Sequence, residues 1–558
     1  MERTINSAID EKIAEIKAGT NAYGTGRVRL VREYIVEATG LDDVCYFERV
    51  LVGDHAEGYV DAVRQDCVLI ALTRINGKVQ VGDQVVATGK EFSAQYSPLS
   101  MGHIVDIFGE DKLAGKRLDQ LRDISIESEP IPIMDRTSVS RPMHTGITGI
   151  DMLYPIGRGQ RQLIIGDKKT GKTQIALDTI YNQRDEDMVC IYVAIGKTKK
   201  DVKDIYSQLL CRGAMEYTII LAAFNDDCAP VLQSTPYAAM SMARTFLDQG
   251  KDVLVVLDDL KRHADVCREI ALLMGKTPGR DAYPPDIFYC HSRMLELGCQ
   301  HKNGGSITVL PICETKSGDI TDFISTNIIS ITDGQIVLST KNFEKGQKPA
   351  INYGLSVSRL GGAVQTPEMK KVGPRIRREL LAYLEQREIF ELANVEEMGE
   401  ALRERMRRGA AILELLKQHA TAILLGVCSG VVASMGGIFV IAALFHLSHE
   451  EYVTFLPKSI TTAIGMGVSE ELGGIVTITV AIIILTGIIG NVIASTVCKV
   501  FRIEEPIAKG LAIGTAAHAI GTARALEMGP IEGAMSSLAV AVAGILTAFT
   551  ASLFAMLL

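Results

Sequence analysis

The spacing of apolar and polar residues changes character along the chain. Residues 7–17 place isoleucines at positions 9, 13 and 16 among charged residues, which predicts a short amphipathic helix. Residues 27–95 instead alternate apolar and polar positions, with turn residues at Asn76–Gly77 and Gly82–Asp83 between the runs. A period of two that is interrupted by such turns predicts a small antiparallel barrel or sheet.

The pattern then becomes that of an α/β domain, followed by charged helices. Between residues 96 and 365, short apolar runs such as RQLIIG, MVCIYVAIG and DVLVVLDD alternate with stretches of helical spacing. Strands that are buried on both faces of a parallel sheet have this composition. Residues 366–418 carry many Arg and Glu residues at helical spacing, and they predict a helical segment.

The rest of the chain is markedly apolar. Three stretches contain no Asp, Glu, Lys or Arg, namely Ala420–Leu447, Leu472–Cys498 and Ala534–Leu558. Each is long enough to cross a hydrocarbon core of ~30 Å, which takes ~20 helical residues. Buried helices of a soluble core are the alternative, but three successive stretches without a polar face argue against it. We therefore expect residues 419–558 to form an all-α transmembrane region.

Composition narrows the function classes. A chain of 558 residues is too long for one core, so several domains are expected. The net charge of −8, from 58 basic and 66 acidic residues, argues against a nucleic-acid partner. Eleven scattered cysteines without a CxxC pair indicate reduced thiols, and neither a disulfide framework nor a zinc site.

A phosphate-binding motif follows a short apolar run in the α/β segment. The sequence GDKKTGKT fits the pattern GxxxxGK[ST], and a stretch of helical spacing follows it. In such a loop the backbone N–H groups curl around phosphate oxygens, the lysine supplies charge and the final hydroxyl faces Mg²⁺. A chance Gly-rich turn would lack this strand-and-helix context. The predicted phosphate-binding residues are Gly166, Asp167, Lys168, Lys169, Thr170, Gly171, Lys172 and Thr173.

A second motif agrees with the first. The apolar run VLVVLDDL ends in Asp258 and Asp259, and a carboxylate at such a strand end can hold Mg²⁺ directly or through water. We therefore predict ATP or ADP with Mg²⁺ as cofactors, and Thr173 and Asp258 as the metal ligands. Hydrolysis also needs a group that orients water, but Lys197 stands where a carboxylate would serve. We interpret Lys197 as part of a solvated basic loop, and we expect no catalysis by the isolated protein.

These motifs resemble the α-subunit family of F-type rotary ATP synthases. The resemblance runs in family order from about residue 20 to Gln418. It rests on residues 155–180 and 349–365 and on the motifs RDAYPPDIFYCHSRMLE, TNIISITDGQI and ILELLKQ. It implies an N-terminal β-barrel, a RecA-like P-loop NTPase domain, a C-terminal helical domain and a hexamer of alternating α and β subunits.

The resemblance also implies roles for single residues. Gly166–Thr173 would form a non-catalytic, regulatory nucleotide site, with Gln418 on the adenine side. Arg359, with Ser356 in the same motif, resembles the catalytic arginine finger that reaches a neighbouring β subunit and stabilises phosphoryl transfer. This chain departs from the family by Lys197, where Gln is usual, by the missing second adenine-side Gln, and by a truncated helical domain.

The apolar region has a separate resemblance. Residues 456–475 and 506–539 resemble the LrgB/CidB family of antiholin-like membrane proteins, to which a region of the plastid glycolate/glycerate transporter is related. The match covers about 418–558 and corresponds to the C-terminal half of that family. The two sequences meet at Lys417–Ala420 without a Gly-, Pro- or Ser-rich linker. A natural fusion, a recombined gene, a designed chimera and an assembly error are all compatible with this join.

Two polar stretches lie between the apolar spans. Residues 457–471 and 506–527 are rich in Gly, Ala and Thr and carry the ionisable residues Lys458, His518 and Arg524. Paired, Gly-interrupted segments are candidates for broken helices that line a substrate site, and these basic groups would suit an anion. Interfacial loops with snorkelling basic residues are the alternative.

The leading hypothesis is an ATP synthase α-type subunit in proton-coupled ATP synthesis or hydrolysis. Its partners would be the β subunit, stalk subunits and membrane lipid, but no nucleic acid. It would lie in the cell membrane with the nucleotide domain on the cytoplasmic face. An LrgB-type transporter or murein-hydrolase and cell-lysis regulator with a nucleotide-binding region is one alternative, and a non-functional chimera is another. The expected domains are 1–26, 27–95, 96–365, 366–418 and 419–558.

Overall fold

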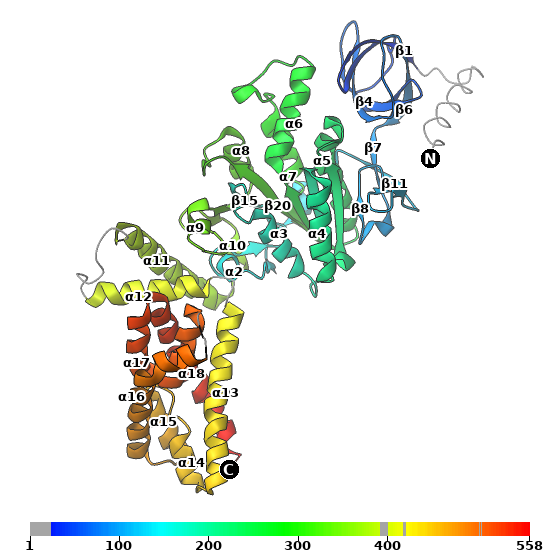
Figure 1. The fold of residues 1–558 in the computed structure, drawn as a ribbon. Helices are drawn as coiled ribbons and strands as arrows, with labels where there is room; N and C mark the ends of the chain where they lie inside the picture. Colours follow the sequence, from blue (N-terminus) through cyan, green and yellow to red (C-terminus); the bar gives the residue numbers. More distant parts are fainter. Residues whose placement is uncertain (1–23, 391–399, 417–419, 502, 504, 558) are drawn as a thin grey trace. The chain divides into compact units, whose positions relative to one another are not determined.

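The computed structural model describes residues 24–390, 400–416, 420–501, 503 and 505–557 (Figure 1). These residues form two compact units, which divide between Thr366 and Pro367. The first unit contains a barrel and a large sheet, and the second contains helices only. The amphipathic helix predicted at residues 7–17 lies outside the described residues.

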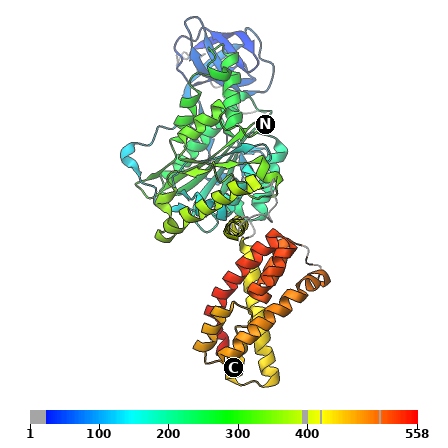
Figure 2. The ribbon, with the colours of Figure 1, turned by 90° about the vertical axis from the view of Figure 1, so that its left-hand side faces the viewer.

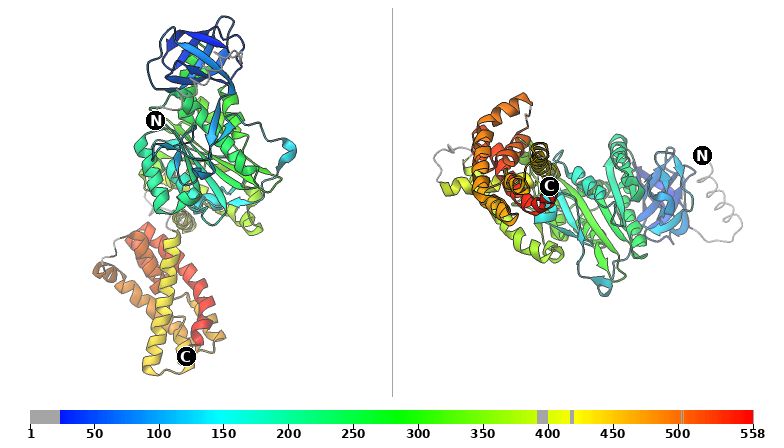
Figure 3. Two further views of the ribbon diagram at one scale, coloured as in Figure 1. Left: turned by 90° about the vertical axis from the view of Figure 1, so that its right-hand side faces the viewer. Right: turned by 90° about the horizontal axis from the view of Figure 1, so that it is seen from below.

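The first unit begins with a closed antiparallel barrel, drawn in blue in Figures 2 and 3. Alternate side chains fill its interior, and Val36, Val50 and Val60 are fully buried there. The period of two in the sequence therefore becomes the inward and outward faces of the barrel wall. Its strands, in the order β1-β2-β5-β4-β3-β6, are β1 (Thr25–Arg32), β2 (Ile35–Thr39), β5 (Val68–Ile75), β4 (Ala56–Val63), β3 (Glu48–Val52) and β6 (Gln84–Glu91).

A mostly parallel sheet follows the barrel. Its central strands are parallel to one another, and every residue of β18 is buried. The non-alternating apolar runs therefore belong to strands that are covered on both faces. In spatial order the central strands are β17 (Thr218–Phe224), β16 (Met188–Lys197), β18 (Asp252–Asp258), β20 (Ser306–Thr315), β15 (Gln162–Asp167) and β21 (Gly334–Leu338).

Helices connect these strands and pack on the sheet (Figure 1). They are α3 (Lys172–Tyr181), α4 (Lys199–Cys211), α5 (Ala229–Leu247), α6 (Leu260–Leu273), α7 (Ile287–Leu295) and α8 (Phe323–Ile331). Short strands extend the sheet, with β8 (Ile104–Val105), β9 (Glu110–Asp111) and β10 (Lys116–Arg117) at one edge and β22 (Val357–Ser358) at the other.

The remaining elements of the first unit are short. They are β7 (Ser93–Tyr96), β11 (Arg122–Ser125), β12 (Arg136–Thr137), β13 (Pro142–Met143), β14 (Ile156–Gly157), β19 (Cys299–His301), α2 (Thr148–Leu153), α9 (Thr340–Glu344) and α10 (Gly361–Val364). The pairs β7–β11 and β13–β14 form small two-stranded sheets of their own.

The second unit consists of helices. Its elements are α11 (Pro367–Phe390), α12 (Glu400–Leu415), α13 (Ala420–Phe445), α14 (His449–Phe455), α15 (Thr462–Glu471), α16 (Val476–Val500), α17 (Pro506–Met528) and α18 (Pro530–Ala555). Within the described residues, the segments that are long and apolar enough to cross a membrane are Leu425–Phe445, Val476–Val500 and Met535–Ala555. In Val476–Val500, only 17% of the most apolar 18-residue stretch is buried inside the protein, so most of the surface of this helix suits lipid.

Small residues let the helices of this unit approach closely. A Cβ atom on Gly510 or on Gly514 would lie 2.5 Å or 2.4 Å from a backbone oxygen of α18. Glycine at both positions therefore sets the contact between α17 and α18. The helix α17 is interrupted at His518, where φ is +40° and ψ is −144°. The polar stretch 506–527 is thus an interrupted helix and not an interfacial loop.

The fold class predicted from the sequence is confirmed. A small antiparallel barrel, an α/β domain and a helical region with membrane-capable segments follow one another along the chain.

Candidate functional site

The loop that follows β15 has the backbone shape that its glycines permit. Gly171 has a φ of +98°, a left-handed conformation that side chains with a Cβ rarely adopt. A Cβ atom on Gly166 would lie 2.8 Å from the carbonyl oxygen of Leu338 on β21. The first glycine therefore allows close packing, and the second allows the chain to enter α3 at Lys172.

Lys172 is held inside the curl of this loop. Its Nζ donates to the carbonyl oxygens of Gly166 and Asp167 at 2.9 Å and 2.6 Å. Burial lowers the pKa of the Lys172 ammonium, and the carboxylate of Glu314 on β20 partly offsets this effect. The backbone N–H groups at the start of α3 and the ammonium thus converge on one place, which suits a phosphate group.

The other loop residues divide into two groups. Lys168 and Lys169 are exposed, whereas Thr170 is buried and donates to the carbonyl oxygen of Asp167 at 2.8 Å. The Asp167 carboxylate accepts hydrogen bonds from Thr315 at 2.6 Å and from Thr340 at 2.9 Å. The Asp167 side chain therefore anchors the loop to its neighbours, and only its backbone belongs to the phosphate-facing curl.

The predicted metal ligands lie together. Thr173 Oγ1 donates to Asp258 Oδ2 at 2.8 Å, because the parallel register places the ends of β15, β18 and β20 at one edge of the sheet. The buried hydroxyl of Tyr192 donates to the same oxygen at 2.6 Å. Among the described residues, no group of three or more His, Cys, Asp or Glu side chains could hold a metal ion. A Mg²⁺ ion here would therefore depend on Thr173, on Asp258 and on the nucleotide itself.

Lys197 belongs to this site, so its interpretation as part of a solvated basic loop is wrong. It ends β16, and its Nζ lies 2.7 Å from Asp258 Oδ1 and 3.9 Å from Asp259 Oδ2. The Asp258 side chain is only 2% exposed. Burial disfavours the Lys197 ammonium, but the two carboxylates outweigh it and raise the pKa of Lys197 above its ordinary value.

Asp259 has a structural contact of its own. Its carboxylate accepts a hydrogen bond from the backbone N–H of Arg262 at 2.7 Å and so caps the start of α6. Burial, with the adjacent Asp258 carboxylate, raises the pKa of Asp259 to about 6.

Strand pairing brings three further residues to the site, namely Tyr192, Glu314 and Thr315. The sequence offered no motif that marked them, because only the register brings them to this edge.

Arg359 lies beyond the end of β15 that is opposite the phosphate loop. Ser356 instead contacts Val337, which pairs with Ile165 near the loop end. Strand pairing aligns Gln162, the first residue of β15, with Gly334, and Gly334 with Ser358. The phosphate loop follows the other end of β15, roughly 13 Å away for four residues of strand. Arg359 therefore does not approach the phosphate loop of its own chain.

The environments of these two residues differ. Ser356 is fully buried, and its hydroxyl donates to Asn352 O at 2.7 Å and accepts from Val337 N at 3.0 Å. Arg359 is exposed, and its guanidinium has one long hydrogen bond, to Thr332 O at 3.4 Å. Ser356 thus shapes the turn that presents Arg359. Gln418, predicted on the adenine side, lies outside the described residues.

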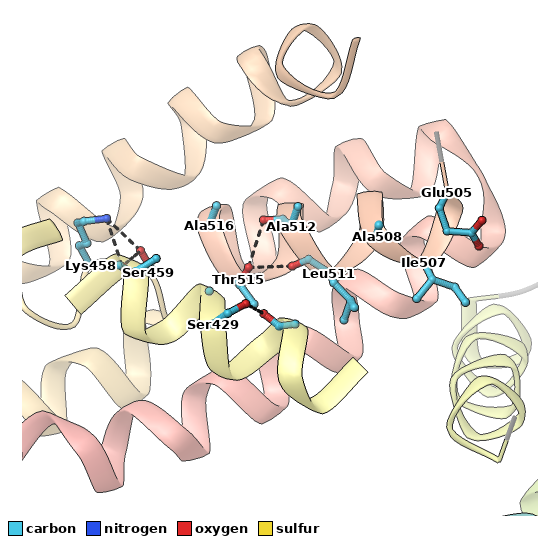
Figure 4. A pocket seen from close by; sticks show the side chains of 14 residues that line it. Ser429, Lys458, Ser459, Glu505, Ile507, Ala508, Leu511, Ala512, Thr515 and Ala516 are labelled. Carbon is cyan, nitrogen blue, oxygen red and sulfur yellow. Dashed lines mark hydrogen bonds between the residues drawn. The ribbon is translucent and has the colours of Figure 1, made fainter. Parts of the chain in front are cut away.

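The helical unit contains a second candidate site (Figure 4). A groove of about 700 Å³ lies between α13, α17 and the segment that precedes α15. Lys458 Nζ donates to Ser434 Oγ at 3.3 Å and to Ser459 Oγ at 3.2 Å. The groove is otherwise lined by small or apolar residues and by Ser429, Thr515 and Glu505.

Lys458 is the only one of the three predicted basic residues that lines this groove. Its printed partners among the described residues are the two serine hydroxyls, and Glu505 is the carboxylate that also lines the groove. His518 is buried, and its Nε2 lies 2.8 Å from Ile483 O. Arg524 donates to Ser495 Oγ at 2.9 Å and pairs with Glu527. The structure therefore does not bring these three residues together into one anion site.

Two family models match separate parts of the chain. The model of the ATP synthase alpha/beta family, nucleotide-binding domain, matches residues 146–358 and so includes the phosphate loop, Lys197 and Asp258. The model of the LrgB-like family matches residues 411–557 and includes all three membrane-capable segments. Residues 146–358 are thus a nucleotide-binding domain of the ATP synthase alpha/beta family, and residues 411–557 are an LrgB-like domain of the same chain.

Proposed function

We propose that the protein is an α-type subunit that binds ATP or ADP at Gly166–Thr173 without hydrolysing it alone. This proposal rests on the position of Lys197 at the end of β16, beside Asp258. A water-orienting group is needed near the terminal phosphate, and an ammonium cannot accept the proton of an attacking water. Lys197 is moreover bound to Asp258 at 2.7 Å, so that both side chains are engaged.

The second part of the proposal is an arginine finger that acts on a neighbouring subunit. Arg359 is exposed, and it lies at the end of β15 that is remote from its own phosphate loop. A guanidinium in this position is exposed and remote from its own phosphate loop, so it is available to a site on another chain. There it would stabilise charge on the transferring phosphoryl group, as such arginines do in other P-loop systems. A β-type subunit in an alternating hexamer, with stalk subunits beneath it, is the partner that this role requires.

A Mg²⁺ ion at this site would have two side chains as its ligands. Thr173 and Asp258 are the side chains that would hold the ion, and the ion would neutralise phosphate charge. Thr173 lies at the start of α3, and Asp258 ends the strand that faces it.

The helical unit associates the protein with a membrane, and we propose that the nucleotide domain faces the cytoplasm, where ATP is available. A first span that starts in the cytoplasm places the loop after the second span there too. Lys499 and Lys509 flank that loop, in agreement with the positive-inside tendency.

Nucleotide binding is tested on the full-length chain in detergent. Isothermal titration calorimetry with ATP compares the parent, Lys172→Ala and the control Lys200→Ala, since Lys200 is exposed on α4. We expect a strong loss of affinity for Lys172→Ala only, because its ammonium lies inside the loop. Equal ATP affinity in all three proteins would rule out the phosphate-loop assignment.

The groove around Lys458 favours a second candidate function, the binding or passage of a small anion. Its ammonium contacts two serine hydroxyls, so a negatively charged solute would complete its environment. Anion flux into liposomes that contain the full chain should fall for Lys458→Gln and persist for Lys499→Gln. Equal flux in both variants would remove this candidate, and would favour a regulator of murein hydrolases or cell lysis, or a chimera without function.

A further inference from the structure

Three side chains of the protein contact the carboxylate of Asp258. Its Oδ2 accepts hydrogen bonds from Thr173 at 2.8 Å and from Tyr192 at 2.6 Å, and its Oδ1 lies 2.7 Å from Lys197 Nζ. A carboxylate has about four lone-pair sites, and three of them are used here. Direct coordination of a metal by Asp258 is therefore limited to the one remaining lone-pair site, unless the metal displaces one of these partners.

The Lys197 ammonium also opposes a divalent ion beside Asp258. Mg²⁺ requires nearly octahedral oxygen ligands at about 2.0–2.1 Å and gives up its waters reluctantly. The ammonium groups of Lys172 and Lys197 both act on the carboxylates Asp258, Asp259 and Glu314. A second cation beside Asp258 would be repelled by the ammonium that already contacts this carboxylate.

Lys197 also changes the charge that faces the phosphate groups of a bound nucleotide. In a phosphate-loop site, an unpaired carboxylate at the strand end repels the phosphate oxygens unless a cation lies between them. Lys197 neutralises Asp258 without any added ion. The side chain of Lys197 is 24% exposed, so it is only partly buried, and its charge can also attract phosphate.

We propose that Lys197 takes over the charge role of the metal, so that this site binds free ATP or ADP with little dependence on Mg²⁺. The inference rests on the proposed nucleotide binding at Gly166–Thr173 and names the residue that sets the metal requirement. Thr173 and Asp258 remain the predicted metal ligands, and Lys197 determines how much an ion bound there contributes.

The experiment measures ATP affinity twice, with excess Mg²⁺ and with excess EDTA. The full-length protein in detergent is compared with Lys197→Gln, with Lys197→Arg and with the control Lys200→Gln. For the parent and for Lys200→Gln we expect the two dissociation constants to agree within about threefold. Lys197→Gln leaves Asp258 without its cation, so its affinity in EDTA should fall at least about tenfold below that in Mg²⁺. Lys197→Arg keeps the charge and should stay close to the parent.

The outcomes separate this inference from the proposed function. Parent protein that binds ATP in Mg²⁺ but at least about tenfold more weakly in EDTA would overturn the role of Lys197 and leave nucleotide binding intact. Parent protein that binds ATP in neither condition would overturn both. Because the parent alone can give either result, the test does not depend on whether Lys197→Gln folds. A metal requirement that is the same in Lys197→Gln as in the parent would also refute the inference.

Discussion

Acidification should weaken the contact between α6 and α7, because two histidines are buried there in the neutral form. His263 and His291 are fully buried, and His263 Nδ1 lies 3.2 Å from His291 Nε2. His263 Nε2 lies 3.2 Å from Gln233 O, which can only accept a hydrogen bond. The Nε2–H of His263 therefore donates to Gln233, and its Nδ1 accepts from His291. No described group within hydrogen-bond distance pairs with His291 Nδ1.

The direction and size of the effect follow from the pKa of His263. Burial lowers this pKa from 6.5 to about 4, and burial likewise lowers the pKa of His291. The unfolded chain thus binds more protons between these two values, so stability is fully present above pH 6.5 and is lost as the pH falls toward 4. For His263 alone, the free energy of opening should fall by about 2 kcal/mol between pH 7.5 and pH 5. His291 should add to this loss.

Hydrogen–deuterium exchange of the peptides from α6 and α7 measures this opening, after correction for the intrinsic pH dependence of exchange. A double variant, His263→Leu with His291→Phe, removes both titrating groups and should abolish the extra pH dependence even if the variant is less stable overall. His144→Gln is the control, since His144 is exposed. Protection of α6 and α7 that is equal at pH 7.5 and pH 5 in the parent would refute the reasoning. If the double variant lost as much protection of α6 and α7 at pH 5 as the parent does, the role of the two histidines would also be refuted.

Three further predictions concern the two domains. With a β-type partner present, Arg359→Ala should reduce ATP turnover of the complex by about 10³–10⁵, measured by phosphate release, and an active variant complex would make Arg359 a structural residue. Gly166→Ala should weaken ATP binding in calorimetry, because its Cβ would lie 2.8 Å from Leu338 O, whereas Gly362→Ala meets open space and should bind like the parent. The full chain should remain in the membrane pellet until detergent is added, and recovery in the soluble fraction would contradict insertion by its three apolar segments.

The sequence predicted those parts of the fold that local patterns determine. The barrel followed from alternation, the sheet from non-alternating apolar runs, and the membrane-capable helices from their length and lack of charge. The phosphate loop could be predicted because its glycines and Lys172 all lie within the single motif GDKKTGKT. Thr173 and Asp258 were paired by motif, and the structure places them 2.8 Å apart.

Other parts of the site depend on strand register, which no local pattern encodes. Tyr192 lies inside an apolar strand and was not distinguishable from a core residue until β16 was placed beside β18. Lys197 was interpreted as a solvated residue for the same reason, since its partner Asp258 is distant in sequence. In the two polar stretches, Lys458, His518 and Arg524 are candidates for an anion site, with interfacial loops as the alternative, and the fold places only Lys458 of the three at the groove.

The boundary between the two compact units does not coincide with the point where the two sequence resemblances meet. The units divide at Thr366–Pro367, whereas the sequence resemblances meet near residue 418 and the LrgB-like match begins at 411. The helix α12 contacts both α11 and α18, and its Leu413 and the following Leu416 are buried. The helix α12 therefore packs with the membrane-capable helices, and the two resemblances meet inside the second unit.

This arrangement predicts how fragments of the protein will behave. A fragment that ends at Thr366 retains all contacts within the first unit and should be monodisperse in size-exclusion chromatography. A fragment that ends at residue 418 keeps α11 and α12 but loses α18, so apolar surface that is covered in the full chain becomes exposed to water. Each leucine that is uncovered costs about 2 kcal/mol of lost burial, and we expect this longer fragment to aggregate. If the longer fragment were monodisperse and the shorter one aggregated, α11 and α12 would belong with the nucleotide domain, and the division at Thr366 would be wrong.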